Sequence, residues 1–209
     1  MTPSTRTALW GLAPSLLGLL VACGGAGTSS TATPGTPSTP APTSGIATYT
    51  TLDLTALPSY AQASYPIHYD AQALAGDNQP ATNGITDLGA TLGRVLFHDK
   101  RLSVGDTVSC ASCHQQALGF GDSATFSTGF QPGLVTGAHS MRLHNARFYT
   151  PGTMFWDKRA ATLEAQTTQP IQSSVEMGFD AAHGGMPALI TKMGALPYYP
   201  ELFKAVSDK

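Results

Sequence analysis

The stretch CASCH constrains this chain most, because Cys110 and Cys113 lie three residues apart and His114 follows at once. Cysteines at this spacing can bind zinc, form a redox disulfide, or add to the two vinyl groups of a haem. Only the haem needs the adjacent histidine, which would bind the iron of a porphyrin held by both thioethers. The spacing therefore predicts a covalent c-type haem on Cys110 and Cys113, with His114 as the proximal iron ligand.

The two alternatives to the haem each require a further feature. A zinc site would need another ligand, for which His139 or His144 is available. A redox disulfide at this spacing usually works in a βαβ setting, whereas the chain shows no alternating strand pattern of useful length. Both alternatives remain open, but the motif favours haem.

The N-terminal part of the chain is typical of an exported protein. Residues 1–22 carry one basic residue followed by a short apolar run, which predicts a signal peptide. The next residue, Cys23, ends the sequence LVAC, which resembles a bacterial lipobox, so Cys23 is predicted to carry the lipid that anchors the mature protein. The alternative is an ordinary signal peptide with a fortuitous cysteine. We therefore expect an extracytoplasmic, periplasmic protein attached to a membrane.

The segment behind Cys23 has no means of building a core. From residue 24 to residue 45 every residue is Gly, Ala, Ser, Thr or Pro, so residues 23–45 are predicted to be a lipid-anchored tether. Residues 46–209 are then left as a single domain. The formal charge of −2 gives no reason to expect nucleic acid as a partner.

Helical periodicity predicts a mainly α domain. Apolar residues of the segment 86–97 recur at helical spacing behind Thr86 and Asp87, which predicts a helix with one buried face. A second helix is predicted to begin at Asp157 and to be limited by Pro170. A third over 187–193 and a fourth from about residue 200 follow. Residues 46–84 show no clear period and are predicted to be an irregular lead-in, and the long loops elsewhere are typical of a fold that wraps a ligand.

Several segments resemble, in order, the bacterial dihaem cytochrome c peroxidase family, which includes the related enzyme that matures methylamine dehydrogenase. They read LGRVLFHDKRLS, SCASCHQQALGFGD, MFWDKRAATLEAQTTQPIQSSVEMGFD and YYPELFK, and they cover most of residues 84–206. The resemblance implies the amino-terminal haem domain of that family, a c-type cytochrome domain with long loops around its haem. It also implies a second haem domain that this sequence does not contain, so the chain is predicted to be truncated, the alternative being a donor haem that resides elsewhere. Calcium is a further cofactor that the resemblance allows.

The resemblance further implies a peroxide site built from Trp156, Gln166 and Glu176. Glu176 would act as the acid-base group that moves a proton between the two peroxide oxygens, Gln166 would orient the peroxide or the glutamate, and Trp156 would carry electrons. The simpler interpretation makes Trp156 a core residue, Gln166 an exposed helix residue and Glu176 a surface carboxylate. Lys158 departs from the family pattern, which has glycine at that position.

The function that the resemblance implies is the reduction of hydrogen peroxide to water, with electrons from a small redox protein such as a c-type cytochrome or a cupredoxin. The alternatives are an electron-transfer cytochrome with both axial positions of the iron filled, and oxidation of a partner protein. Phe130 occupies the position at which members that need reductive activation have an iron-binding histidine. A phenyl ring cannot bind iron, so the peroxide site is predicted to be open. Substitute iron ligands could come from the remaining histidines and methionines, which include His68, His98, His139, His144, His183, Met141, Met154, Met177, Met186 and Met193.

Overall fold

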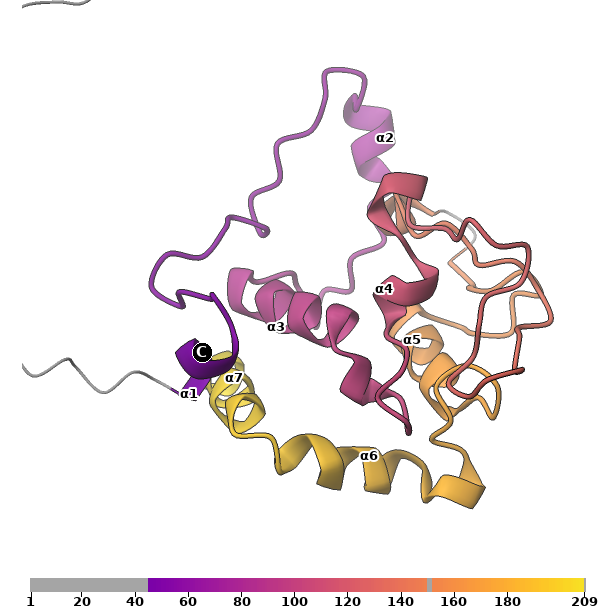
Figure 1. Cartoon of the computed structure of the whole chain (residues 1–209). Helices are drawn as coiled ribbons and strands as arrows, with labels where there is room; N and C mark the ends of the chain where they lie inside the picture. The colour runs from indigo at the N-terminus through magenta and orange to yellow at the C-terminus, as the bar shows by residue number, and fades with distance from the viewer. Residues whose placement is uncertain (1–44, 150–151, 209) are drawn as a thin grey trace, which may run out of the picture. The chain divides into compact units, whose positions relative to one another are not determined.

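The computed structural model describes residues 45–149 and 152–208, and this part of the chain is mainly helical (Figure 1). Its α-helices and 3₁₀-helices are, in order, α1 (Gly45–Tyr49), α2 (Ala71–Ala75), α3 (Asp87–His98), η1 (Lys100–Leu102), α4 (Cys110–Cys113), η2 (Gln116–Leu118), η3 (Ala146–Phe148), α5 (Leu163–Gln172), η4 (Ala181–His183), α6 (Gly185–Gly194) and α7 (Tyr198–Ser207). In place of β-strands, the described residues form three isolated antiparallel bridges. The predicted mainly α class is therefore confirmed.

The described ranges also bear on the N-terminal predictions. Cys23, the predicted signal peptide and nearly all of the tether lie outside them. Within residues 45–149 and 152–208 we find no helix with the length and apolar character that crossing a membrane requires.

The helix predicted over residues 86–97 is α3. Thr86 caps it, because its hydroxyl accepts a hydrogen bond from the Gly89 amide at 3.0 Å. Leu92 is buried in the core, and Val95 and Leu96 pack against it. The apolar periodicity thus identified both the helix and its buried face.

The helix predicted to begin at Asp157 begins six residues later. α5 is capped by Thr162, and residues 154–160 instead form a turn in which Phe155 and Lys158 have φ values of 73° and 58°. A right-handed helix cannot continue through such residues. Pro170 lies inside α5, which continues to Gln172, so the limit predicted at the proline was also wrong. Near a helix end a proline removes only one late hydrogen bond, and the last turn can tolerate that loss.

The lead-in before α3 contains two short helices and is otherwise irregular, much as predicted. Hydrogen bonds attach it to the domain at several points, two of which lie at α1 and α3. The Ile46 side chain is 1% exposed, and its amide donates to Glu201 in α7 at 3.3 Å. The Asp87 carboxylate accepts hydrogen bonds from the amides of Tyr60 and Ala61.

The core lies where α1, α3, η1, α6 and α7 meet, and α7 packs against both α1 and α3 (Figure 1). The two helices predicted near residues 187 and 200 are α6 and α7, so both predictions are confirmed. The buried core side chains are Ile46, Leu92, Leu102, Val108, Phe130, Met177, Phe179, Leu189, Met193, Tyr198, Tyr199 and Leu202.

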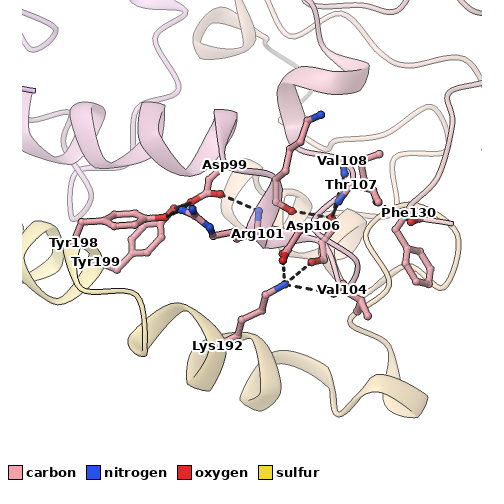
Figure 2. A network of polar contacts seen from close by, with 12 residues as sticks. Asp99, Arg101, Val104, Asp106, Thr107, Val108, Phe130, Lys192, Tyr198 and Tyr199 are labelled. Carbon is pink, nitrogen blue, oxygen red and sulfur yellow. Dashed lines mark hydrogen bonds and ion pairs between the residues drawn. The ribbon is translucent and has the colours of Figure 1, made fainter. Parts of the chain in front are cut away.

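Polar contacts from α6 and α7 fix the segment that leads into CASCH (Figure 2). The Asp99 carboxylate accepts hydrogen bonds from the hydroxyls of Tyr198, at 2.7 Å, and Tyr199, at 2.9 Å. Further along the segment, the Lys192 ammonium donates to the Ser103 carbonyl at 2.8 Å and to the Asp106 carboxylate at 2.5 Å. The backbone that precedes the cysteine motif is therefore held by two helices that come almost 100 residues later.

The two tyrosines should make stability fall at alkaline pH. Burial, followed by the hydrogen bond to Asp99, raises the pKa of Tyr198 from 10.0 to about 12, and the same causes raise the pKa of Tyr199. The folded protein then keeps phenol protons that the unfolded chain loses. Their contribution is complete below pH 10.0 and is lost as the pH rises through the folded-state value of about 12.

We expect Tyr198→Phe and Tyr199→Phe each to flatten this alkaline decline, as measured by the free energy of unfolding in urea at a series of pH values. Tyr149→Phe, on an exposed loop, serves as the matched control and should keep the wild-type slope. Wild-type slopes in all three variants would contradict the assignment.

Candidate functional site

Both cysteines of the motif are carried by one helical turn. α4 consists of Cys110–Cys113, and its N-terminus is closed by a capping box in which the Ser109 amide donates to the Ser112 hydroxyl at 2.9 Å. The His114 amide donates back to the Cys110 carbonyl at 2.9 Å, which extends the turn to the histidine. Both thiols are free and half-buried. Burial raises the pKa of each thiol.

His114 is oriented by a backbone carbonyl. Its Nδ1 lies 2.8 Å from the carbonyl oxygen of Phe120. A carbonyl can only accept, so Nδ1 carries the hydrogen and Nε2 keeps its lone pair. The loop that supplies this carbonyl is closed by a bridge between Gln115 and Gly121 and turns through Gly119, whose φ is 66°. The imidazole is thus held in the tautomer that an iron ligand requires.

These donors fit a covalent haem c. Two free thiols on one turn can form two thioethers, and an imidazole with a free Nε2 beside them can bind the iron. For the zinc alternative, the Nδ1 atoms of His139 and His144 lie 3.0 and 3.1 Å from the carbonyls of Ala124 and Gly119 rather than facing a shared ligand set with the two thiols. Among the residues that the structure describes, no group of three or more His, Cys, Asp or Glu side chains is placed to hold a metal ion. The calcium expected from the resemblance stays a prediction.

Glu176 lies within electrostatic range of this motif. It sits, half-buried, in the turn that follows α5. Burial raises the pKa of its carboxyl, and Arg159 and His114 lower it by smaller amounts. The negative charge of Glu176 in turn helps to raise the pKa of the Cys113 thiol, after burial. The fold therefore brings a carboxylate from the region of residue 176 to the cysteine motif, more than 60 residues earlier in the chain.

Two glycines allow the turn that carries Glu176 to approach the loop after the motif. A Cβ on Gly129 would lie 2.0 Å from the Val175 carbonyl oxygen, so only glycine fits there without a shift of the backbone. A Cβ on Gly178, whose φ is 85°, would lie 2.8 Å from the ring of Phe130. Phe130 is 4% exposed, and its amide donates to the same Val175 carbonyl at 3.2 Å. Phe130 thus has a place in the core, against the turn that holds Glu176.

The other two predicted site residues lie on different elements. Trp156 is 66% exposed in the turn before α5, and its indole N–H donates to the His139 carbonyl at 2.9 Å. Its exposure rules out the core position of the simpler interpretation. Gln166 is half-buried on α5, one helical turn before Pro170 and on the same face. The roles of Trp156, Gln166 and Glu176 stay predictions.

Arg159 connects the parts of this region, although it was not among the residues predicted from the sequence. Its guanidinium lies 3.6 Å from the centre of the Phe155 ring, and it donates to the side chains of Gln169 at 3.0 Å and Asp157 at 2.9 Å. Its positive charge also lowers the pKa of the Glu176 carboxyl. The signal that could have identified it is its place in WDKR, directly within the segment that resembles the family.

Ser127 was also missed. It is fully buried, and its hydroxyl lies 2.6 Å from the Asp122 carboxylate and 2.8 Å from the Ser140 hydroxyl. The Asp122 carboxylate also accepts a hydrogen bond, at 3.4 Å, from the side chain of Gln115, which lies two residues after Cys113. This network fixes the loop beyond the motif, and a serine within a Gly- and Ser-rich stretch gives no sequence signal of such a role.

Lys158 offers a test of the turn before α5. A lysine with φ of 58° is strained, because the left-handed region crowds its Cβ. We expect Lys158→Gly to raise the free energy of unfolding by about 1 kcal/mol. Lys204→Gly in α7, where the backbone is helical, should lower it by about 1 kcal/mol. Denaturant unfolding of both variants measures these changes, and equal effects of the two substitutions would contradict the geometry.

A family model decides the relationship of this chain to known proteins. The model of the di-haem cytochrome c peroxidases matches residues 88–208, which is more than half of the chain and includes CASCH and Glu176. The chain belongs to the di-haem cytochrome c peroxidase family. The fold expected from the resemblance, a mainly α c-type cytochrome domain, is the fold of this family member.

Curated relatives agree with the di-haem cytochrome c peroxidase assignment. The chain is 37% identical to the methylamine utilization protein MauG of Methylorubrum extorquens over 60% of this chain and 33% of that protein. It is 33% identical to the cytochrome-c peroxidase IdrP1 of Denitromonas iodatirespirans over 61% and 32%, and 34% identical to the cytochrome c551 peroxidase of Pseudomonas aeruginosa over 60% and 34%. The chain thus spans about a third of the length of these relatives.

A solved structure shows the same relationship. A MauG-like protein associated with microbial copper homeostasis superimposes with a TM-score of 0.55 at 32% identity. The match covers 62% of this chain and 36% of that protein. Members of the di-haem cytochrome c peroxidase family therefore share both sequence and fold with the haem-motif region described above.

Proposed function

We propose that this domain binds haem c through Cys110 and Cys113, with His114 on the iron, and is the peroxide-reactive part of an oxidoreductase that reduces hydrogen peroxide to water. Its electrons come from a small redox protein, such as a c-type cytochrome or a cupredoxin. The observation that carries the proposal is the combination of two free thiols on one turn, an imidazole with a free Nε2, and a half-buried carboxylate within electrostatic range of both.

The haem would supply the iron at which peroxide binds and through which electrons reach it. Glu176 accepts the proton from the peroxide oxygen nearer the iron and returns it to the departing oxygen. A carboxyl whose pKa burial has raised is suited to both transfers, because it holds a proton more readily than an exposed carboxylate does. Gln166 donates a hydrogen bond that orients the peroxide or Glu176.

If haem is bound through His114, residue 130 would supply no second iron ligand, so peroxide could reach the iron before any reduction. Phe130 has no atom that can bind iron, and its ring is packed in the core against Gly178 and 5.6 Å from the ring of His183. His183 is itself tied to Asp180 by a 2.8 Å contact of Nδ1. The oxidised protein is therefore competent for peroxide without reductive activation.

Trp156 supports a second candidate function, the oxidation of a partner protein. Its side chain is 66% exposed, so a protein docked over it could exchange electrons with the domain. A relative at 37% identity is a methylamine utilization protein, MauG. Release of a modified partner, with peroxide consumed, would favour this function over reduction of peroxide alone.

The domain works outside the cytoplasm, held to a membrane by lipid on Cys23 and by the tether of residues 23–45. Residues 1–22 are removed as the signal peptide. What supports this proposal is the LVAC sequence and the composition behind it.

We expect haem to stay with the chain on a denaturing gel stained for haem, because thioether bonds survive unfolding. Replacing both Cys110 and Cys113 with alanine should abolish the stain, whereas Cys23→Ser should keep it. Haem that leaves the wild-type chain in acidified organic solvent would contradict covalent attachment.

The function itself is tested with the oxidised, haem-loaded chain mixed with hydrogen peroxide. A high-spin absorbance spectrum that changes at once, together with oxidation of a reduced c-type cytochrome, is the expected result. A low-spin spectrum that peroxide leaves unchanged would replace the peroxidase with an electron-transfer cytochrome.

A further inference from the structure

Two buried phenols share one carboxylate oxygen in the core (Figure 2). The hydroxyls of Tyr198 and Tyr199 donate to the same Oδ2 atom of Asp99, at 2.7 and 2.9 Å. The two rings are 2% and 1% exposed, and their centres lie 4.6 Å apart. Phenylalanine would fill the same space in the core. Packing alone therefore does not explain why two hydroxyls share a carboxylate here.

The arrangement has the groups that oxidation of a phenol requires. A phenol that loses an electron becomes a strong acid, so oxidation is easiest where a base already accepts its hydrogen bond. Asp99 is such a base, because it is ionised: burial acts to raise the pKa of its carboxyl, but hydrogen bonds from Tyr198, the Arg101 amide and Tyr199 hold the pKa below its ordinary value. The proton has a destination within hydrogen-bond distance.

Arg101 makes the two phenols unequal. Its guanidinium donates to the Tyr198 hydroxyl and lies 5.6 Å from the centre of the same ring. This positive charge opposes the loss of an electron from Tyr198. Both hydroxyls donate to Asp99, but among the described contacts Arg101 donates to the Tyr198 hydroxyl and not to that of Tyr199. Tyr199 is therefore the more readily oxidised of the pair.

An aromatic ring leads from this pair to the surface, and α3 packs both against α7, which carries the pair, and against α4, which carries the cysteines. Toward the surface, Tyr49 is 53% exposed and its ring lies 5.4 Å from that of Tyr198. Toward the motif, the carbonyl that orients His114 belongs to Phe120, whose ring lies 6.2 Å from Phe97. The Phe97 ring lies 5.4 Å from that of His98, the residue before Asp99. One helix, α3, thus separates the helix of the tyrosine pair from the helix of the cysteine motif.

We propose that Tyr199, with Asp99 as its proton acceptor, is an oxidisable site that supplies an electron to a haem c oxidised by peroxide, and that Tyr198 and Tyr49 connect this site with electron donors at the surface. The inference rests on the proposed function, since the haem is the oxidant. Reduction of peroxide to water takes two electrons, and an oxidisable phenol in the same domain can provide one of them.

Oxidation of Tyr199 transfers one proton and one electron. The O–H bond of Tyr199 breaks, its proton moves to Oδ2 of Asp99, and its electron passes to the oxidised haem. The products are a neutral tyrosyl radical, a protonated Asp99 and a haem reduced by one electron. An electron from the external donor protein, with return of the proton from Asp99, restores both side chains.

The test is freeze-quench electron paramagnetic resonance of the full, haem-loaded chain mixed with peroxide. We expect a tyrosyl radical signal that Tyr199→Phe largely removes and Tyr149→Phe, at an exposed site, leaves intact. Asp99→Asn keeps both phenols and a hydrogen-bond acceptor but removes the base, so it should also lose most of the signal. A wild-type radical yield in Tyr199→Phe, or in Asp99→Asn, would overturn the proposal.

The haem absorbance of the same samples separates this inference from the proposed function. If the haem spectrum responds to peroxide but no radical forms, the tyrosine site is wrong and the peroxidase stands. If the spectrum does not respond, the proposed function fails, and hexachloroiridate(IV), a one-electron oxidant, then tests the tyrosines directly. A radical that depends on Tyr199 under this oxidant supports the site, and its absence overturns it.

Discussion

Replacing Glu176 with glutamine is expected to slow the reaction of the oxidised, haem-loaded protein with peroxide by about 10²–10⁴-fold, the usual contribution of a general acid-base group. Glutamine keeps the size of the side chain and its hydrogen bonds but can neither accept nor return a proton. Because the iron and its ligands are unchanged, peroxide should still bind. The loss should therefore fall on the step that cleaves the O–O bond.

Stopped-flow absorbance after mixing with peroxide measures this rate directly. Glu164→Gln is the matched control, since Glu164 is an exposed carboxylate on the neighbouring helix α5 and bonds the Asn83 side chain at 3.0 Å. It should react at the wild-type rate. Equal rates in the wild type and Glu176→Gln would leave the peroxidase in place but remove Glu176 from its mechanism.

Replacing Gly129 with alanine should have the largest effect on the fold around the site. Its new Cβ would lie 2.0 Å from the Val175 carbonyl, a distance that only a backbone shift can relieve. The cost should exceed the roughly 1–3 kcal/mol of ordinary overpacking, because a backbone atom cannot rotate away as a side chain does. The turn that carries Glu176 must move, so peroxide reactivity should fall together with stability.

Gly137→Ala provides the control within the same loop, because a Cβ there meets no atom within 4 Å. It should change neither the free energy of unfolding nor the rate with peroxide. The two quantities are measured by denaturant unfolding and by stopped-flow absorbance on each haem-loaded variant. Wild-type stability of Gly129→Ala would show that the loop and the turn are further apart than described.

Local patterns predicted much of this fold. The apolar spacing and the Thr86 cap defined α3 within one residue, and the prolines at the starts of α6 and α7 marked both helices. The start of α5 was misplaced because Asp157 is a good capping residue by type. What the sequence does not reveal is the left-handed backbone of Lys158, which ends any helix at that point.

The site was predictable only where its residues are adjacent in the chain. The spacing of Cys110, Cys113 and His114 is enough to predict their role. The approach of Glu176 to this motif depends on Gly129, which lies some 45 residues before Glu176 in the chain. Arg159 and Ser127 act through contacts that cross the loops, and no periodicity records such contacts. A resemblance to a family supplied Glu176, whereas the physical reason for its position became visible only in three dimensions.

The hydrogen bond between Asp99 and Tyr199 joins residues that are 100 positions apart in the chain. It can therefore form only after α7 has been synthesised. A chain emerges from its N-terminal end, so the cysteine motif is made well before α7. Until α7 docks, the segment before the motif lacks the tyrosines that fix it, and closing so long a loop is entropically slow. During that interval the two thiols lie on an open chain that a haem-attachment enzyme can reach. If the proposed haem is attached in that interval, the docking of α7 would complete the fold around a cofactor already bound.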